Sequence, residues 1–273
     1  MMATTDLLLK PDHVRQILDY LEVEVGQPDL TWLNQLITAY TEHVPWESAS
    51  RIVRRANISK LAERPRRPAE FWEQAMTQGA GGTCFESNLA FISLLRAVGV
   101  GYEGYLTIND MGDFRGCHTA MVIMVDEEKY LVDAGFPLYA ALPIHPGEIT
   151  QVDTPYQHND VRPIALDRYE IERIPHPKLN CYTLIDQSVN EVDYIAATTA
   201  DYDVNGLFLD RMVITKVVNG RVWRFNSGEK PYHLEMFHEG VRYDTPIEGD
   251  SGQVIGEHFG IDTEIVSRAL ALI

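Results

Sequence analysis

A cysteine at the start of a predicted helix is the residue in this sequence best suited to covalent chemistry. Cys84 follows the glycine cluster of residues 79–82 and opens a segment with helical apolar spacing. Free backbone N–H groups and the helix dipole at such a position favour a negatively charged sulfur, the nucleophilic form. The glycines leave room for a substrate carbonyl, and the N–H of Phe85 is a candidate oxyanion donor. The stretch predicts a nucleophile, with a buried structural cysteine as the alternative.

A thiolate nucleophile needs a base, and the base needs an orienting group. His118 stands at the start of an apolar strand, and Asp133 lies in an otherwise apolar run on the next strand. A buried carboxylate is costly unless it is paired, so His118 is its expected partner. A two-residue turn at 126–127 would make the pair diagonal neighbours on one face, whereas a loop at 126–129 would require a bulge. The sequence leaves both registers open.

Other roles for these residue types fit less well. A zinc site built from Cys117 and the three residues above is disfavoured, because adjacent ligands on a strand diverge and no short-spaced ligand pair is present. No metal is therefore expected. Cys117 is predicted to point to the opposite face from His118, into the core. Six further histidines have no nucleophile nearby in the sequence and are interpreted as loop or edge residues: His145, His158, His176, His233, His238 and His258.

The elements that position the nucleophile are predicted to be mostly helical over residues 11–100. Apolar residues recur at three- and four-residue spacing in three stretches. These are residues 14–25, 33–40 and 71–76, the first ended by Gly26 and Pro28 and the last by Gly79. A fourth helix is predicted from Cys84 to Gly99. The basic, poorly patterned residues 51–68 are interpreted as a helix end and a surface loop whose arginines are solvated.

From about residue 101 the apolar spacing changes to a period of two, which is typical of strands. The predicted strands are residues 102–108, 118–125, 129–136, 161–174, 181–187, 212–218 and 221–225. Asn219 and Gly220 predict a tight hairpin turn between the last two. A final helix is predicted over residues 263–272, capped by Asp262 or Thr263. Helices first, strands next and a helix last indicate an α+β fold.

Composition narrows the class of protein. The chain has 273 residues, 45% of them hydrophobic, which excludes global disorder and allows one large domain or two. Lys and Arg total 23 against 40 Asp and Glu, and a net charge of −17 disfavours nucleic acid and membrane surfaces as partners. Three cysteines are too few for a disulfide framework, and no signal peptide is recognisable, so a cytoplasmic location is expected. The oligomeric state stays open.

Together these residues resemble the arylamine N-acetyltransferase family. The family's nucleophile motif, Arg-Gly-Gly-x-Cys-x-Glu-x-Asn, is matched by Gly81, Gly82, Cys84, Glu86 and Asn88. Its histidine precedes an apolar strand, as His118 does, and its Asp-x-Gly-Phe turn is matched by Asp133, Gly135 and Phe136. Two further segments are similar to family segments, namely Val44-Pro45-Trp46-Glu47 and Phe259-Gly260-Ile261. The resemblance covers most of the chain.

The resemblance implies three units around a cysteine-protease-like Cys-His-Asp core. They are a helical bundle at residues 1–100 that carries the nucleophile, a central antiparallel β-barrel at 101–190 that carries the histidine and aspartate, and a C-terminal α/β lid with a final helix at 191–273. The implied reaction is ping-pong acetyl transfer from acetyl-CoA through Cys84 to the nitrogen of an arylamine or arylhydrazine. The expected partners are therefore an acyl-CoA cosubstrate and a small aromatic amine, with no tightly bound cofactor.

The chain departs from the family pattern at several positions. Ala80 stands in place of an arginine, Ser48 in place of an asparagine, and Pro137 in place of a glycine. The family's Ser-Thr-x-Pro-x-Ser segment, which lines the coenzyme A cleft, corresponds here to residues 197–202. Only Thr198 matches it, so Thr198 is the expected cosubstrate contact, and Asp201 adds a negative charge where phosphates would approach.

Three other functions fit the same residues. An amidase or thioesterase would use water in place of the amine, and an amide synthase would use a different acyl donor. A non-catalytic relative that binds an aromatic ligand would fit the changes at Ala80 and in the cleft segment. Acetylation of Cys84, followed by discharge to an arylamine or to water, separates these functions.

Overall fold

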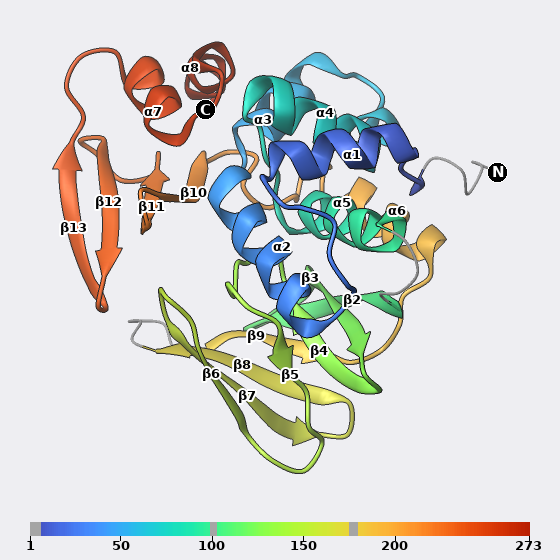
Figure 1. Cartoon of the computed structure of the whole chain (residues 1–273). Coiled ribbons are helices and arrows are strands. Elements are labelled where there is room, and N and C mark those ends of the chain that lie inside the picture. The colour runs from blue at the N-terminus through green and yellow to red at the C-terminus, as the bar shows by residue number, and fades with distance from the viewer. Residues whose placement is uncertain (1–6, 99–102, 175–179) are drawn as a thin grey trace.

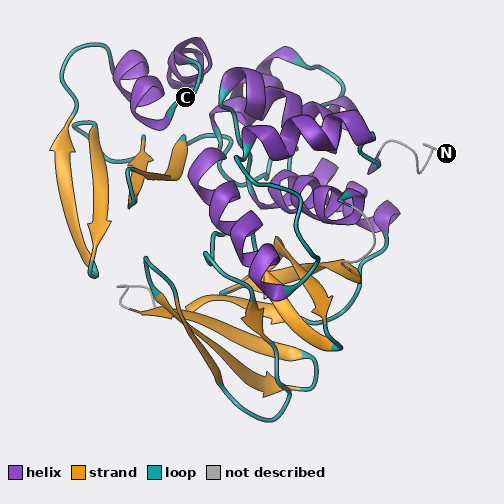
Figure 2. Cartoon of the chain, in the orientation of Figure 1, coloured by secondary structure: helices purple, strands orange, loops and turns teal. Residues whose placement is uncertain are grey.

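The structure is a computed structural model that describes residues 7–98, 103–174 and 180–273. Helices come first, followed by a large antiparallel sheet, one further helix, a second sheet and two final helices (Figure 1, Figure 2). The first helices are α1 (Pro11–Tyr20), α2 (Leu30–His43), α3 (Ala49–Asn57), α4 (Pro68–Gln78) and α5 (Cys84–Ala97). A short 3-10 turn at Leu61–Glu63 connects α3 to α4. The architecture is α+β, as the sequence predicts.

Helix α5 is buried because helices cover one side of it and strands the other. It contacts α1 and α4 as well as β2 (Glu103–Met111) and β3 (Phe114–Val125). Its residues are buried from Cys84 to Leu95, including polar ones, which is the pattern of a helix inside a core rather than on a surface. Thr83 is the residue before its first turn. The predicted helix beginning at Cys84 is therefore confirmed.

The strands of the middle region form an eight-stranded antiparallel sheet within the described residues, in the order β5-β4-β3-β2-β9-β8-β7-β6. The remaining strands are β4 (Glu128–Val132), β5 (Leu142–Pro143), β6 (Thr150–Asp153), β7 (His158–Ala165), β8 (Arg168–Ile174) and β9 (Asn180–Ile185). The sheet curls into a nearly closed barrel below the helices in Figure 1. The hydroxyl of Thr150 on β6 donates to the carbonyl oxygen of Pro143 on β5 at 2.6 Å, which links the first strand of the sheet to the last.

The hairpin between β3 and β4 decides the register that the sequence leaves open. Val125 pairs with Glu128, so Asp126 and Glu127 alone form the turn. Both have positive φ, 50° and 67°, as a type I′ turn requires. Met121 pairs with Val132 further along, so the first of the two registers is correct.

The second sheet combines a short strand from the N-terminal helical region with strands from the C-terminal region. Its order is β1-β10-β11-β12-β13. The strands are β1 (Trp46–Glu47), β10 (Val213–Val218), β11 (Arg221–Asn226), β12 (His233–His238) and β13 (Val241–Pro246). Trp46 pairs with Thr215, so a strand between the early helices belongs to the C-terminal sheet. Val218 pairs with Arg221 around Asn219 and Gly220, which confirms the predicted hairpin.

Three helices complete the fold. They are α6 (Glu191–Ala200), α7 (Ser251–Phe259) and α8 (Thr263–Ala271). Asp262 caps α8 by accepting from the N–H of Glu264, as predicted. Tyr194 of α6 packs into the same core as α5. Helix α6, from the predicted unit 191–273, thus contacts the predicted unit 1–100, and β1 of the first unit pairs with β10 of the last. That division stays a prediction.

Several predicted elements were wrong in extent. The first helix ends at Tyr20, because Glu22 adopts a left-handed φ of 57°, and Val25 is exposed beyond it. The predicted strand 161–174 is two strands, β7 and β8, joined by a turn in which Asp167 has a φ of 54°. Strands β5, β6, β12 and β13 and helices α6 and α7 were missed. Strand β13 is exposed at every residue, so it has no apolar alternation to detect. Residues 99–102, where one helix end and one strand start were predicted, lie outside the described residues.

Glycines 79 and 112 give a matched test of how α4 is held against the C-terminal helices. Both have a φ near +60°, but a Cβ on Gly79 would lie 1.8 Å from the carbonyl oxygen of Gly260, whereas one on Gly112 would meet nothing within 4 Å. Both alanine substitutions carry a left-handed backbone cost of about 1–2 kcal/mol. Only Gly79→Ala adds a clash, which we expect to lower the free energy of unfolding by about 1–3 kcal/mol more. Urea unfolding followed by tryptophan fluorescence measures the difference, and equal midpoints for the two variants would contradict this packing.

Candidate active site

The start of α5, the start of β3 and the turn after β4 bring together Cys84, His118 and Asp133. His118 Nε2 lies 2.6 Å from Asp133 Oδ2. Nδ1 is therefore the ring nitrogen left for the thiol, and a hydrogen bond with Cys84 is among the interactions that act on the imidazole. All three side chains are buried. The three residues selected from the sequence thus meet at one place.

The Asp133 carboxylate is fixed by backbone and side-chain donors. Its Oδ1 accepts from the N–H groups of Gly135 at 2.9 Å and Phe136 at 2.8 Å. The same oxygen accepts from Asn88 Nδ2 at 3.1 Å. Because Oδ1 is occupied in this way, Oδ2 is held facing His118.

Asn88 connects α5 to β3 and to the turn after β4. Its Nδ2 donates to the carbonyl oxygen of Thr119 at 2.6 Å, and its Oδ1 accepts from the N–H of Ala134 at 2.9 Å. The hydroxyl of Thr119 donates in turn to the carbonyl oxygen of Cys84 at 3.2 Å. The start of α5 is therefore hydrogen-bonded to β3, next to His118, and to the turn after β4, next to Asp133.

Gly135 allows the turn after Asp133 to pass directly against the nucleophile. A Cβ at this position would lie 2.3 Å from Cys84 Cα and 2.7 Å from Cys84 Cβ. Any side chain here would push the helix start away from the turn. The Asp-x-Gly-Phe motif thus requires glycine on steric grounds, because only a residue without a side chain permits this close approach.

The surroundings of His118 favour its charged form. Burial alone would lower the pKa of His118, but the charge of Asp133 and hydrogen bonds with Asp133 and Cys84 raise it to about 10. The ring also packs on Tyr182, with the ring centres 4.4 Å apart. These contacts favour an imidazolium, which is the counter-ion that a thiolate needs.

A buried arginine holds the loop before the nucleophile. Arg66 is 1% exposed, and its guanidinium lies 2.6 Å from the Glu86 carboxylate and 2.6 Å from the carbonyl oxygen of Gly81. Tyr202 donates to the same carboxylate at 2.8 Å. The prediction that the arginines of residues 51–68 are solvated is wrong for Arg66, because a carboxylate buried in the first turn of α5 requires a cation.

Arg51 is the second buried guanidinium beside this loop, and it too is only 1% exposed. It donates to the Thr83 hydroxyl at 2.7 Å and pairs with the Asp201 carboxylate at 2.7 Å. The charge of Asp201, which was expected to face phosphates, is thus balanced inside the protein. Sequence reasoning missed both arginines. The apolar setting of Glu86 was the available signal, since a buried acid implies a buried partner.

The remaining predicted residues are Phe85, Thr198 and Cys117. Phe85 is the second residue of α5, where backbone N–H groups have no partner within the helix. Thr198 is buried, and its hydroxyl donates to the carbonyl oxygen of Tyr194 within α6, so the structure does not bring it to the three residues. Its role, like that of Phe85, stays a prediction. Cys117 is half-buried rather than a core residue, because its Sγ lies near the strand start with Phe114 O at 3.6 Å.

One cluster in the described residues has metal-ligand proximity. Glu229, His233 and Glu235 place their ligand atoms within 4.8 Å of one another on the second sheet. Two arginines lie among them, Arg224 at 3.5 Å and Arg242 at 3.8 Å from Glu235 Oε2. Arg242 also lies 2.6 Å from His233 Nε2, the nitrogen that would bind a metal. We interpret the cluster as an ion-pair network.

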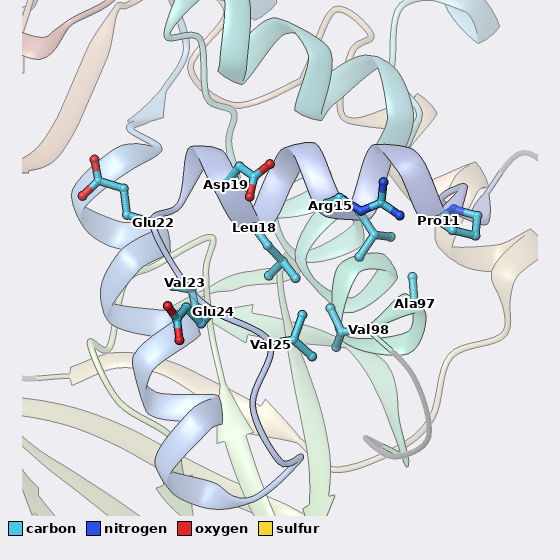
Figure 3. Close-up of a pocket in the computed structure, with 11 residues that line it drawn as sticks. Pro11, Arg15, Leu18, Asp19, Glu22, Val23, Glu24, Val25, Ala97 and Val98 are labelled. Carbon is cyan, nitrogen blue, oxygen red and sulfur yellow. The ribbon is translucent and has the colours of Figure 1, made fainter.

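A cavity of about 730 Å³ lies between α1, the segment that follows it and the end of α5 (Figure 3). Its lining includes Leu18, Val23, Val25, Ala97 and Val98. Ala97 is at the opposite end of α5 from Cys84, about 20 Å along the helix axis. The cavity is therefore separate from the candidate site.

Comparisons with known proteins agree with this fold. A family profile described as N-acetyltransferase matches residues 29–266. The solved arylamine N-acetyltransferase of Salmonella typhimurium is similar in fold, with a TM-score of 0.79 and 15% identity over 97% of this chain and 100% of that one. That of Mycobacterium smegmatis gives 0.77 and 17% over 94% and 97%. That of Mycobacterium marinum, solved in complex with CoA, gives 0.76 and 16% over 94% and 98%.

The chain therefore belongs to the arylamine N-acetyltransferase family. No curated protein sequence matches it. Within residues 7–98, 103–174 and 180–273, no helix combines the length and the apolar character that crossing a bilayer requires.

The charge state of His118 can be tested with Asp133→Asn. The retained Oδ1 can still accept from Gly135, Phe136 and Asn88, while the charge that raises the pKa of His118 is lost. We expect the wild-type imidazole to be protonated still at about pH 8 and the imidazole of the variant to titrate at lower pH. NMR measures both titrations on the Cε1 resonance of His118, which is assigned by its loss in His118→Asn. Because the folded pKa exceeds the free value of 6.5, the stability from this pair is complete below pH 6.5 and is lost as the pH rises towards 10. Identical titration of the two proteins would disprove the pairing.

The buried ion pair behind the loop predicts a large difference between two arginine variants. Arg66→Gln leaves the Glu86 carboxylate uncompensated inside the protein and should lower the free energy of unfolding by about 3–5 kcal/mol. Arg54→Gln breaks the partly exposed pair with Glu70 and should cost about 1 kcal/mol or less. Urea unfolding compares the two, and similar midpoints would mean that the Arg66 pair is not desolvated.

Proposed function

We propose that this protein transfers an acetyl group from acetyl-CoA to the nitrogen of an arylamine or arylhydrazine, through a thioester on Cys84. The observation that carries the proposal is the contact of His118 with Asp133 beside a cysteine at a helix start. Family membership supports the transferase reaction, and the CoA complex of a relative of similar fold supports an acyl-CoA donor.

In the first half-reaction the Cys84 thiolate attacks the thioester carbonyl of the donor. The negative charge that develops on the carbonyl oxygen is favoured by N–H groups at the start of α5, including that of Phe85. The bond between carbonyl carbon and the coenzyme sulfur then breaks. The leaving thiolate takes the proton from the His118 imidazolium, so the step ends with acetylated Cys84, a neutral imidazole and free CoA thiol.

In the second half-reaction the amine nitrogen attacks the acetyl carbonyl on Cys84. The neutral imidazole of His118 removes the proton from the nitrogen as the carbon–nitrogen bond forms. The carbon–sulfur bond breaks, and the products are the acetylated amine, the Cys84 thiolate and the imidazolium. Asp133 acts through His118 by holding the ring in place and stabilising its charge.

The surroundings of His118 suit an aromatic acceptor. The partly buried Phe136 has its ring centre 6.0 Å from that of His118 in an edge-to-face arrangement. Tyr182 covers another side of the imidazole. An aryl ring can pack against such aromatic surfaces with its nitrogen directed at the base.

Intact-mass measurement after incubation with acetyl-CoA or 4-nitrophenyl acetate tests the proposal. We expect one acetyl group on the wild type and none on Cys84→Ser, because the hydroxyl of serine is a far weaker nucleophile than a thiolate. Addition of an arylamine should discharge the acetyl group faster than buffer alone.

Other outcomes assign other functions. Discharge by water at the same rate with and without amine would identify a hydrolase and refute the transferase. Acetylation by the aryl ester but not by acetyl-CoA would refute the donor and point to an amide synthase with another acyl source. The absence of label from any donor would leave a protein that only binds its ligand.

A further inference from the structure

A cation without a carboxylate partner lies next to the candidate active site. Arg173 of β8 places its guanidinium carbon 4.7 Å from the centre of the Phe136 ring. Its Nε has no hydrogen-bond partner. The groups that act on its charge are Cys181, Tyr139 and Arg224, and none of them is a carboxylate. Within the described residues, Arg173 is thus held by an aromatic ring rather than by an ion pair.

This arrangement differs from that of neighbouring arginines in the same sheet. Arg162 of β7 lies 3.1 Å from the Glu172 carboxylate, and Arg168 of β8 lies 3.7 Å from that of Asp110. Arg173 is mostly buried, and burial lowers the pKa of this guanidinium. Keeping a cation largely out of water without an anion is unfavourable. In a chain with 40 acidic residues, the missing counter-ion points to one that a ligand brings.

The position of Arg173 relates it to the proposed chemistry. The Phe136 ring contacts both groups: the guanidinium carbon of Arg173 lies 4.7 Å from its centre and the His118 ring centre lies 6.0 Å from it. Phe136 is itself fixed, because its N–H donates to Asp133. The guanidinium and the base therefore share one aromatic neighbour, which places Arg173 near enough for one substituted aromatic substrate to meet both.

We propose that Arg173 binds a negatively charged oxygen group of a substrate, so that the site accepts anionic substrates in a strongly acidic protein. The group is either a carboxylate on the aromatic acceptor or a phosphate of the acyl donor, since a guanidinium donates to both with the same forked geometry. The inference rests on the proposed function, because it places this group in the substrate of that reaction. Phe136 orients the guanidinium by stacking, which leaves its N–H groups free for the anion.

Ping-pong kinetics separate the two sources, because each substrate has its own half-reaction. With 4-nitrophenyl acetate as a neutral donor, acceptors are compared as a pair, 4-aminobenzoate against 4-aminobenzamide. With a neutral acceptor, donors are compared as a pair, acetyl-CoA against the uncharged thioester S-acetyl-N-acetylcysteamine. In Arg173→Gln we expect kcat/KM to fall about tenfold or more for the anionic member of one pair, with little change for its neutral counterpart.

Controls separate charge recognition from packing. Arg168→Gln, on the same strand but paired with Asp110, should leave both pairs unchanged. Arg173→Lys should recover part of the lost activity, because it restores the charge without the fork. Thermal unfolding verifies that each variant is folded.

Each outcome decides the proposal. Selective loss with 4-aminobenzoate assigns the acceptor carboxylate, and selective loss with acetyl-CoA assigns the donor phosphate. Equal losses for charged and neutral members, or no loss, would overturn it and leave Arg173 as a support for Phe136. Calorimetry of 4-aminobenzoate, 4-aminobenzamide and CoA binding to the unacylated protein gives a second readout. If wild type is never acetylated, the proposed function fails, while loss of anion binding in Arg173→Gln would still sustain the subsite.

Discussion

The burial of one carboxylate sets the geometry of the whole candidate site. Asp133 can be charged in the interior only because donors reach both of its oxygens, His118 on one and Gly135, Phe136 and Asn88 on the other. These donors come from β3, from the turn after β4 and from α5. The hydrogen bonds that solvate this charge therefore also fix the three elements relative to one another, and the thiol and the imidazole are placed as a result.

A second set of buried charges fixes the loop that leads into the nucleophile. Arg66 binds the carbonyl oxygen of Gly81, and Arg51 binds the hydroxyl of Thr83. Between them, the N–H of Glu47 donates to the carbonyl oxygen of Gly82 at 3.2 Å. Each residue of this three-residue loop is thus held by a different element, although the fully buried Ala80 before it contributes no charge. Two guanidinium groups from distant positions in the sequence thus hold the loop that precedes Cys84 in place.

The parts of the site that could be predicted are those specified by short stretches of sequence. The helix at Cys84, the strand that carries His118, the strand that ends at Val132 just before Asp133, and the Asn219-Gly220 hairpin all follow from apolar spacing and turn chemistry within a few residues. The register between β3 and β4 could not be predicted, because residues 126–127 and 126–129 both make acceptable loops. The backbone angles of Asp126 and Glu127 decide between them.

The buried arginines were beyond sequence reasoning for a different reason. Arg51 is paired with Asp201, which is 150 positions away, and Arg66, which precedes α4, is paired with Glu86 of α5. A basic stretch with weak periodicity is identical in sequence whether it faces water or a buried acid. Arg173 raises the same difficulty, since its contact with Phe136 depends on how the barrel closes.

The short strand β1 has a consequence for when the loop before Cys84 acquires its contacts during synthesis of the chain. Trp46 bridges to Gly82 and also pairs with Thr215 of β10, while the N–H of Val213 donates to the hydroxyl of Ser48. A nascent chain that has reached residue 190 already contains the cysteine, the histidine and the aspartate. It still lacks β10 and Asp201, and with them half of the framework around the Gly81–Thr83 loop. The surroundings of the Gly81–Thr83 loop next to Cys84 are thus complete only after the chain has been made as far as the end of β10, at Val218.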